Sequence, residues 1–196
     1  MNFFKQVYFN NTILSYFIAV RIFILLYTLL KIFRKIGLNR LKKLSETTKT
    51  TIDDFIVSAI ERSVLPLLNF TAFYISLNTL TLSDKVQKLL HAASVVVITF
   101  FALRLLIAAI KHAIENKIKK QENSETKLKQ VKGIMIIISV LIWILGIVFL
   151  LDNFGYNVTA FITGLGIGGI AVALAAQNIL GDLFNYFVIF FDRPFE

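Results

Sequence analysis

The sequence predicts an all-α integral membrane protein with five transmembrane helices, and two observations carry that prediction. Apolar residues make up 57% of the 196 positions and the mean hydropathy is +0.73, whereas a soluble domain contains about 45–50% apolar residues. The apolar residues also gather into separate runs, most of them with the roughly 20 residues that a helix needs to cross a bilayer. We expect the fifth helix to be kinked and to be followed by an amphipathic helix at the membrane interface.

The distribution of charge predicts the orientation of these helices. The segments 31–49 and 111–132 carry seven basic residues each, whereas the N-terminal segment and the outer connections carry three in all. Under the positive-inside rule both basic segments are cytoplasmic loops, which places the N-terminus outside and the C-terminus in the cytoplasm. Their lysines also favour contact with anionic lipids. A net charge of +9 that is concentrated in such loops does not indicate nucleic-acid binding.

The first four helices are expected to form a peripheral region, residues 1–156. Their apolar runs lie at about 12–33, 53–82, 91–113 and 133–151. The first run lacks a small-residue cleavage site and its basic residues follow it, so we interpret it as a mature helix and not as a signal peptide. Asp53 and Asp54 are typical of the acidic first turn of the second helix, and Pro66 predicts a kink within that helix.

Charged residues within the apolar runs have two interpretations. Arg21 and Arg104 either line a functional polar site inside the membrane or extend to the lipid interface, which we favour. Glu61 and Arg62 lie near the cytoplasmic end of the second run, where an interfacial ion pair is expected. The two histidines stand at opposite ends of the third run and the sequence has no cysteine, so we expect neither a metal site nor a cofactor.

The stretch 160–195 combines five glycines and several alanines with large aliphatic residues. Glycine costs about 1 kcal/mol against alanine within a helix, but in a membrane small residues let helix backbones approach closely and associate. On a helical wheel of about 100° per residue, the small residues fall on two nearly opposite faces, which we call the small-residue seams. One seam carries Gly164, Gly168, Ala171 and Ala175, and the other carries Gly166, Gly169, Ala173 and Ala176.

A helix with two such seams can pack against a neighbour on each side, and repeating that contact closes a ring around an axis. The apolar wedge between the seams consists of Thr163, Ile167, Ile170 and Leu174. If this wedge faces the axis, Ile170 and Leu174 form stacked rings about one helical turn apart, and such a hydrophobic constriction excludes water and ions. An ordinary close-packed helix in a transporter or a monomeric bundle is the alternative.

The segment Gly164 to Gly169 also fits the dinucleotide-binding pattern GxGxxG, and Asp192 follows at a suitable distance. A Rossmann half needs further strands. Everything upstream has the composition of membrane helices, so we set dinucleotide binding aside.

The run from Leu165 to Gln177, followed by Arg193-Pro194-Phe195, resembles the pore helix of the small-conductance mechanosensitive channel (MscS) family. Thr50-Thr51-Ile52-Asp53-Asp54 after a basic loop is similar to a segment of the five-helix members. The resemblance implies a homoheptamer in which residues 157–196 form a pore helix and an amphipathic helix, around a hydrophobic gate opened by bilayer tension. Aligned without gaps, the constricting leucines of the family fall on Ile170 and Leu174.

Two departures from the family pattern concern the kink of the pore helix. Asn178 stands where the family usually has a glycine after the pore glutamine, here Gln177, and Tyr186 replaces its second kink glycine. The bend is therefore expected at Gln177 and Asn178, or shifted to Gly181. The position of Ile167 is usually small in the family, which affects the packing or narrows the pore.

The resulting prediction is a mechanosensitive ion channel and not an enzyme, which releases ions and small solutes on osmotic downshock. The resemblance implies the bacterial inner membrane. Family members continue into a soluble cytoplasmic vestibule, which we expect to be absent from this chain. The alternative is a secondary transporter whose glycine-rich segment is a broken helix at the substrate site. Such a site usually needs paired polar ligands near the bilayer centre, and the fifth helix offers few besides Thr163.

Overall fold

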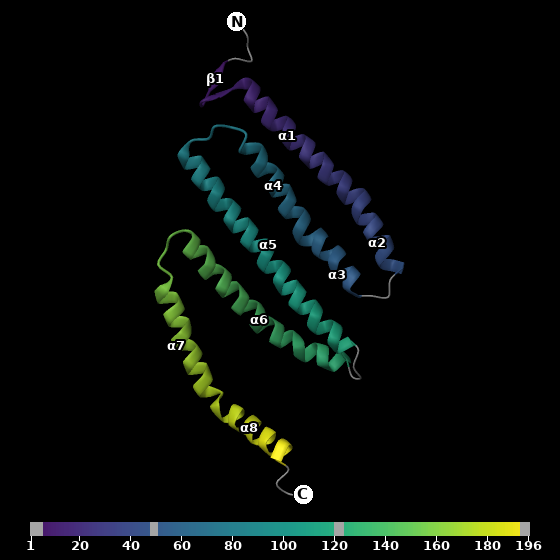
Figure 1. The fold of residues 1–196 in the computed structure, drawn as a ribbon, viewed down its shortest axis with the longest axis vertical. Coiled ribbons are helices and arrows are strands. Elements are labelled where there is room, and N and C mark those ends of the chain that lie inside the picture. The colour runs from purple at the N-terminus through teal and green to yellow at the C-terminus, as the bar shows by residue number, and fades with distance from the viewer. Residues whose placement is uncertain (1–5, 48–50, 120–123, 193–196) are drawn as a thin grey trace. The chain divides into compact units, whose positions relative to one another are not determined.

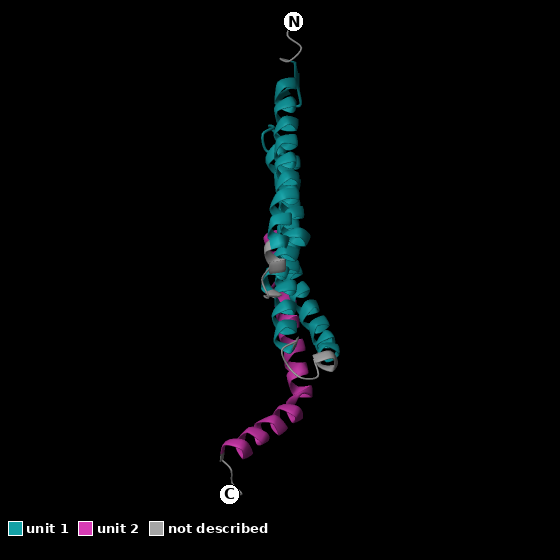
Figure 2. Ribbon diagram, turned by 90° about the vertical axis from the view of Figure 1, so that its right-hand side faces the viewer, with its two compact units in different colours: residues 1–150 teal, residues 151–196 magenta. Residues whose placement is uncertain are grey.

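The computed structural model describes residues 6–47, 51–119 and 124–192. The chain divides into two units, Met1–Leu150 and Leu151–Glu196, which Figure 2 shows in different colours. We call them unit 1 and unit 2 and describe each by itself. The Arg193-Pro194-Phe195 motif and Thr50 lie outside the described residues.

Four long helical stretches follow a short hairpin in unit 1 (Figure 1). The first consists of α1 (Ile13–Ile32), the π-helical turn η2 (Phe33–Gly37) and α2 (Leu38–Thr47). The second consists of α3 (Thr51–Ala59), the π-helical turn η3 (Ile60–Val64) and α4 (Leu65–Leu77). The third is α5 (Asp84–Lys119) and the fourth is α6 (Ser124–Asn153).

Unit 2 contains α7 (Thr159–Ala175) and α8 (Gln177–Asp192). A tight turn precedes α7, in which Gly155 adopts a φ of 79° that glycine tolerates without strain. Among the described residues, four helices are long and apolar enough to cross a membrane, and α7 with α8 add a fifth if the bent pair counts as one span. The predicted all-α membrane fold is thus confirmed.

The helices extend further than the apolar runs that predicted them. The first stretch continues past residue 33 to Thr47, the third begins at Asp84 instead of about 91, and the fourth begins at Ser124 instead of about 133. Hydropathy marks only the part of a helix that lies in lipid, whereas lysine, glutamate and leucine continue a helix equally well in water. The second stretch is shorter than expected and ends at Leu77 instead of about 82.

Pro66 is accommodated without breaking the second helix, which counts as one continuous candidate span over Ile52–Leu77. The π-helical turn η3 directly precedes the proline, and the N–H of Leu65 donates to the carbonyl of Ile60. Pro66 then stands in the first turn of α4. A wider turn before the proline and a place at a helix start both relieve the missing donor and the ring clash.

The first three helical stretches pack against one another within unit 1. The Ser76 hydroxyl donates to the carbonyl of Ala19 at 2.6 Å, which joins α4 to α1 at a buried point. Leu38, Val57 and Leu65 form a small buried cluster where α2, α3 and α4 meet. Buried hydrogen bonds and apolar contacts therefore both fix the rotation of these helices.

The N-terminal hairpin was not predicted from the sequence. β1 (Val7–Tyr8) pairs antiparallel with β2 (Asn11–Thr12). The side chain of Asn11 donates to the carbonyl of Thr81 and accepts from its N–H, both at 2.8 Å. We call this the Asn11 clasp. It ties the start of the chain to the connection between α4 and α5, because an asparagine side chain can pair with both backbone groups of one residue.

Candidate functional site

The helix α7 contains the small-residue seams and the apolar wedge. It starts after Asn157, whose side-chain oxygen accepts a hydrogen bond from the N–H of Thr159 at 2.9 Å, and the carbonyl of Val158 accepts from Ile162 at 2.9 Å. The rest of unit 2 leaves every residue of α7 exposed. An exposed apolar helix is stable in a membrane because lipid tails are as apolar as its side chains. The glycines of such a helix have no packing role within unit 2.

The glycines of the two seams leave open space around them. A Cβ atom added at Gly164, Gly166, Gly168 or Gly169 would meet no other atom within 4 Å. Gly146 in α6 is different, because a Cβ atom there would overlap the side chain of Leu103. Close approach explains the glycine in α6, whereas nothing in the described part of unit 2 explains those of α7.

The side chains of the apolar wedge are also exposed. Ile167, Ile170 and Leu174 are 65%, 63% and 65% exposed, and Thr163 is also exposed. Ile170 and Leu174 stand four residues apart, so their side chains lie about one helical turn apart on the same face. The described residues of unit 2 do not cover either of them.

The bend between α7 and α8 measures 57°. It lies at Ala176, whose φ of −88° and ψ of −3° are those of a turn and not of a regular helix. The N–H of Ala176 still donates to Val172 and its carbonyl still accepts from Leu180, both at 3.0 Å. The bend therefore directly precedes Gln177, whereas Asn178 and Gly181 lie inside α8. It needs no glycine because the turn angles of Ala176 are open to any residue.

The helix α8 has one polar and one aromatic face. Tyr186 stacks on Phe190 with ring centroids 6.3 Å apart, and Phe187 stacks on Phe191 at 6.4 Å. Such a helix is typical of the membrane interface. The polar residues that gather on the other side, when residues are spaced at about 100°, are Gln177, Asn178, Asp182 and Asn185.

The two arginines within the apolar runs have different surroundings. Arg21 is exposed on α1. Arg104 lines a cavity between the α3–η3 segment and α5, together with Arg62 and Lys111. The expected pairing of Glu61 with its neighbour Arg62 is not what the structure shows. Instead Glu61 contacts Arg34 and Lys42.

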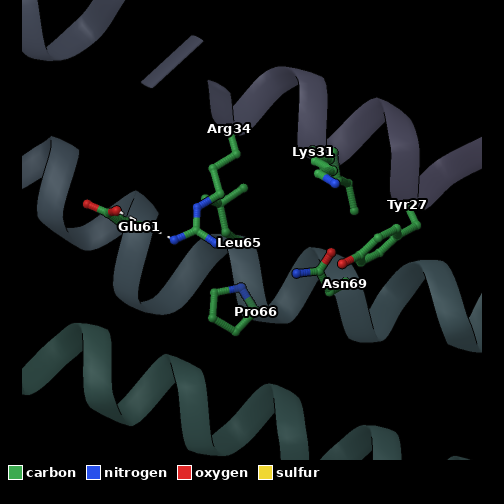
Figure 3. Close-up of a pocket in the computed structure, with 8 residues that line it drawn as sticks. Tyr27, Lys31, Arg34, Glu61, Leu65, Pro66 and Asn69 are labelled. Atoms are coloured by element: carbon green, nitrogen blue, oxygen red, sulfur yellow. Dashed lines mark ion pairs between the residues drawn. The ribbon is translucent and has the colours of Figure 1, made fainter. Parts of the chain in front are cut away.

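The Glu61 cluster, consisting of Glu61, Arg34 and Lys42, was missed by sequence reasoning. A Glu61 carboxylate oxygen lies 3.8 Å from Arg34 and the other lies 3.1 Å from Lys42. Figure 3 shows Arg34 and Glu61 directed at each other across a cavity that Tyr27 and Asn69 also line. The two π-helical turns η2 and η3 each supply one member of the Arg34–Glu61 pair. The sequence does place the acid Glu61 in a helix that follows the basic segment 31–49. It does not reveal which helix faces the carboxylate.

Potential metal ligands do not gather in the part of the chain that the structure describes, since no group of three histidine, aspartate or glutamate side chains lies together there.

One comparison with known protein families matches the segment that contains α7. The family "Mechanosensitive ion channel, transmembrane helices 2/3" matches residues 137–177, which include most of α6 and all of α7. The small-conductance mechanosensitive channel MscMJ of Methanocaldococcus jannaschii is 36% identical over 194 residues, which cover 96% of this chain and 55% of that protein. The chain belongs to the MscS family.

Two further relatives differ in how much of the chain they match. The large-conductance mechanosensitive channel MscMJLR of the same organism is 26% identical over 98% of this chain and 54% of its own length. The low conductance mechanosensitive channel YnaI of Escherichia coli is 40% identical over 45 residues, 23% of this chain and 13% of its own length. The chain spans about half the length of the first two relatives. No solved structure matches it.

Proposed function

We propose that this MscS-family chain forms the membrane part of an ion channel that opens under membrane tension. The observation that carries the proposal is α7, whose two seams and apolar wedge have no packing partner among the described residues of unit 2. A helix of this kind is suited to pack against copies of itself around an axis. The names of the relatives MscMJ and MscMJLR support the same interpretation.

In the proposed assembly, seven copies of α7 pack through their small-residue seams and turn the apolar wedge toward a central pore. Ile170 and Leu174 form two stacked rings, with Thr163 and Ile167 further along the same wall. A narrow ring of aliphatic side chains expels water, so ions do not pass while the rings stay close. The gate is therefore closed by dewetting and not by a charge.

Tension opens the gate because it favours the conformation with the larger area in the membrane plane. The helices of unit 1 are the tension sensors, and their movement with the lipid draws the α7 helices apart until the rings wet. Ions and small solutes then leave the cell on osmotic downshock. This scheme has the N-terminus outside, the C-terminus in the cytoplasm, and anionic lipids at the basic loops.

The substitution Leu174→Ser tests the gate. A ring of hydroxyl groups holds water more readily than a ring of leucines, so we expect patches containing the complete protein to conduct at rest and to open at lower tension. Patch-clamp recording of reconstituted liposomes measures both quantities. An unchanged tension threshold without resting current contradicts a gate at Leu174.

Val172→Ser is the matched control. Val172 is 69% exposed and lies on the opposite side of α7 from the wedge. The same loss of an aliphatic side chain should leave the resting current unchanged there. Equal leak in both variants would point to general disruption of α7 instead of a gate.

A further inference from the structure

A cavity of about 280 Å³ between the α3–η3 segment and α5 concentrates positive charge. Arg62 of η3 and Arg104 and Lys111 of α5 line it, together with His112 and Glu115. The only ion pair that the structure shows among these five side chains is Lys111 with Glu115, at 3.9 Å. Three cations therefore share the cavity with one carboxylate.

The two guanidinium groups lack a carboxylate partner in the part of the chain that the structure describes. Within the described residues, no acid lies at ion-pair distance from Arg62 or Arg104, although both are exposed toward the cavity. Glu61, the acid next to Arg62 in sequence, is directed to the other side of η3, where it contacts Arg34 and Lys42. Cations in a membrane helix are costly unless an anion neutralises them. The cavity therefore has an excess of positive charge that an anion would neutralise.

A third donor is available at the wall of the cavity. The ring of His112 stacks on Phe55 with centroids 4.6 Å apart and an angle of 19° between the planes. Its Nε2 atom is buried and has no hydrogen-bond partner within the described chain. Unpaired buried polar atoms are unfavourable, and an anionic oxygen in the cavity would accept a hydrogen bond from this nitrogen when it carries a proton.

Space for an apolar chain adjoins this cavity. A groove of about 540 Å³ between α5 and α6 shares Lys111 and Glu115 with it and continues along Met135, Ile136 and Trp143. The lining of the groove is mostly aliphatic or aromatic. A charged cavity next to an apolar groove matches the two parts of a phospholipid.

We propose that Arg62, Arg104, Lys111 and His112 bind the phosphate of an anionic phospholipid, and that the groove beside them holds one of its acyl chains. Guanidinium groups bind phosphate oxygens through paired hydrogen bonds, and a net positive cavity prefers an anionic lipid to a zwitterionic one. The long arginine side chains reach the phosphate level from within the span. Lys111 and His112 belong to the basic segment 111–132, but the site does not involve α7. It therefore stands or falls independently of the proposed gate.

Trp143 provides a probe of the groove because it is the only tryptophan of the sequence. Liposomes of dioleoylphosphatidylcholine that contain the complete protein are mixed with rising fractions of phosphatidylglycerol with brominated chains, which quench tryptophan fluorescence. The Trp143→Phe variant gives the background from any other tryptophan of the complete protein. We expect saturable quenching at low fractions of the anionic lipid, and much weaker quenching by brominated phosphatidylcholine.

The double variant Arg62→Gln with Arg104→Gln tests the headgroup contacts. Loss of two charge-assisted contacts should weaken phosphatidylglycerol selectivity by at least about tenfold. Arg34→Gln is the matched control, because this arginine lies on the other side of η3 beside Glu61, and it should keep the selectivity of the original protein. Equal quenching by the two lipids, or equal loss in the control, overturns the proposal.

A final experiment distinguishes a bound lipid from a bound soluble anion in the cavity. Inorganic phosphate is added at millimolar concentration before the brominated lipid. If the occupant is a lipid, phosphate should leave the quenching curve unchanged, because it gains nothing from the groove. If phosphate displaces the lipid completely and protects Trp143, the cavity is a site for a soluble anion and the lipid assignment is wrong.

Discussion

Unit 1 contains a closely packed glycine and buried polar contacts, whereas the described residues of unit 2 contain neither. In unit 1, a Cβ atom at Gly146 would overlap Leu103, and the buried Ser76 and Asn11 bond to distant parts of the chain. In unit 2, none of residues 151–191 is buried, and the glycines of α7 stand in open space. Unit 1 contains buried contacts between parts of its own chain that are distant in sequence. Unit 2 carries the small residues of a packed interface without the partner, which is why we propose that other copies supply it.

The largest effect is expected from Gly169→Leu in a small-residue seam. Leucine favours a helix over glycine by roughly 0.8–1 kcal/mol, so α7 itself should remain helical. The larger side chain should nevertheless keep neighbouring α7 helices apart. Native mass spectrometry of the complete protein in detergent should show seven copies for the original protein and smaller species for the variant, together with loss of tension-activated current.

Gly133→Leu is the control for this comparison. A Cβ atom at Gly133 also meets no atom within 4 Å, but Gly133 belongs to α6 in unit 1. The number of copies should not change. If the original protein is a monomer or a dimer, or if Gly169→Leu assembles normally, unit 2 is not the interface, and the transporter alternative gains support.

An intermediate effect is expected from Asn11→Ala. The substitution leaves the N–H and carbonyl of Thr81 without their partners at a site where Asn11 is only 7% exposed. Leaving buried polar groups unpaired costs about 1–3 kcal/mol. The free energy of unfolding can be measured by titration with a denaturing detergent and circular dichroism.

The variant Asn157→Ala in unit 2 gives a loss of unfolding free energy to compare with that of Asn11→Ala in unit 1. Asn157 bonds to the nearby N–H of Thr159 and is exposed, so its loss should cost less, about 1 kcal/mol or below. Equal losses in the two variants would mean that the Asn11 clasp contributes nothing beyond local backbone support.

The smallest effect is expected from Glu61→Gln. The side chain of Glu61 is 35% exposed, and its partners Arg34 and Lys42 are 66% and 48% exposed. Exposed ion pairs contribute about 0.2–1 kcal/mol, and salt screens them. The unfolding free energies of the original protein and the variant should therefore converge as the salt concentration is raised. A large loss that does not depend on salt contradicts this account.

The membrane helices were predictable because each is a local property of the sequence. A run of apolar residues near the required length marks a span wherever it occurs, and the four spans of unit 1 and the bent pair of unit 2 follow from such runs. The ends of α2, α5 and α6 were not predictable in the same way, since charged residues that leave the membrane still form a helix.

Contacts between helices were less predictable. From the sequence, Glu61 was expected to pair with Arg62, but neighbouring residues on a helix point in different directions. In the structure, Glu61 contacts Arg34 and Lys42. Arg104 likewise had no identifiable partner until α5 was seen beside η3, where it shares a cavity with Arg62. The roles of Ile170 and Leu174 stay predictions, because a single chain leaves both exposed.

By itself the sequence determined the membrane class, the succession of helices, and the two small-residue seams of α7, because hydropathy and helical spacing depend only on residues close together in the chain. The tertiary structure alone decided that the bend lies at Ala176, that Pro66 follows a π-helical turn, and that three cations meet across η3 and α5. These features depend on how each helix is rotated and shifted against its neighbours, which side-chain packing sets and no local pattern encodes.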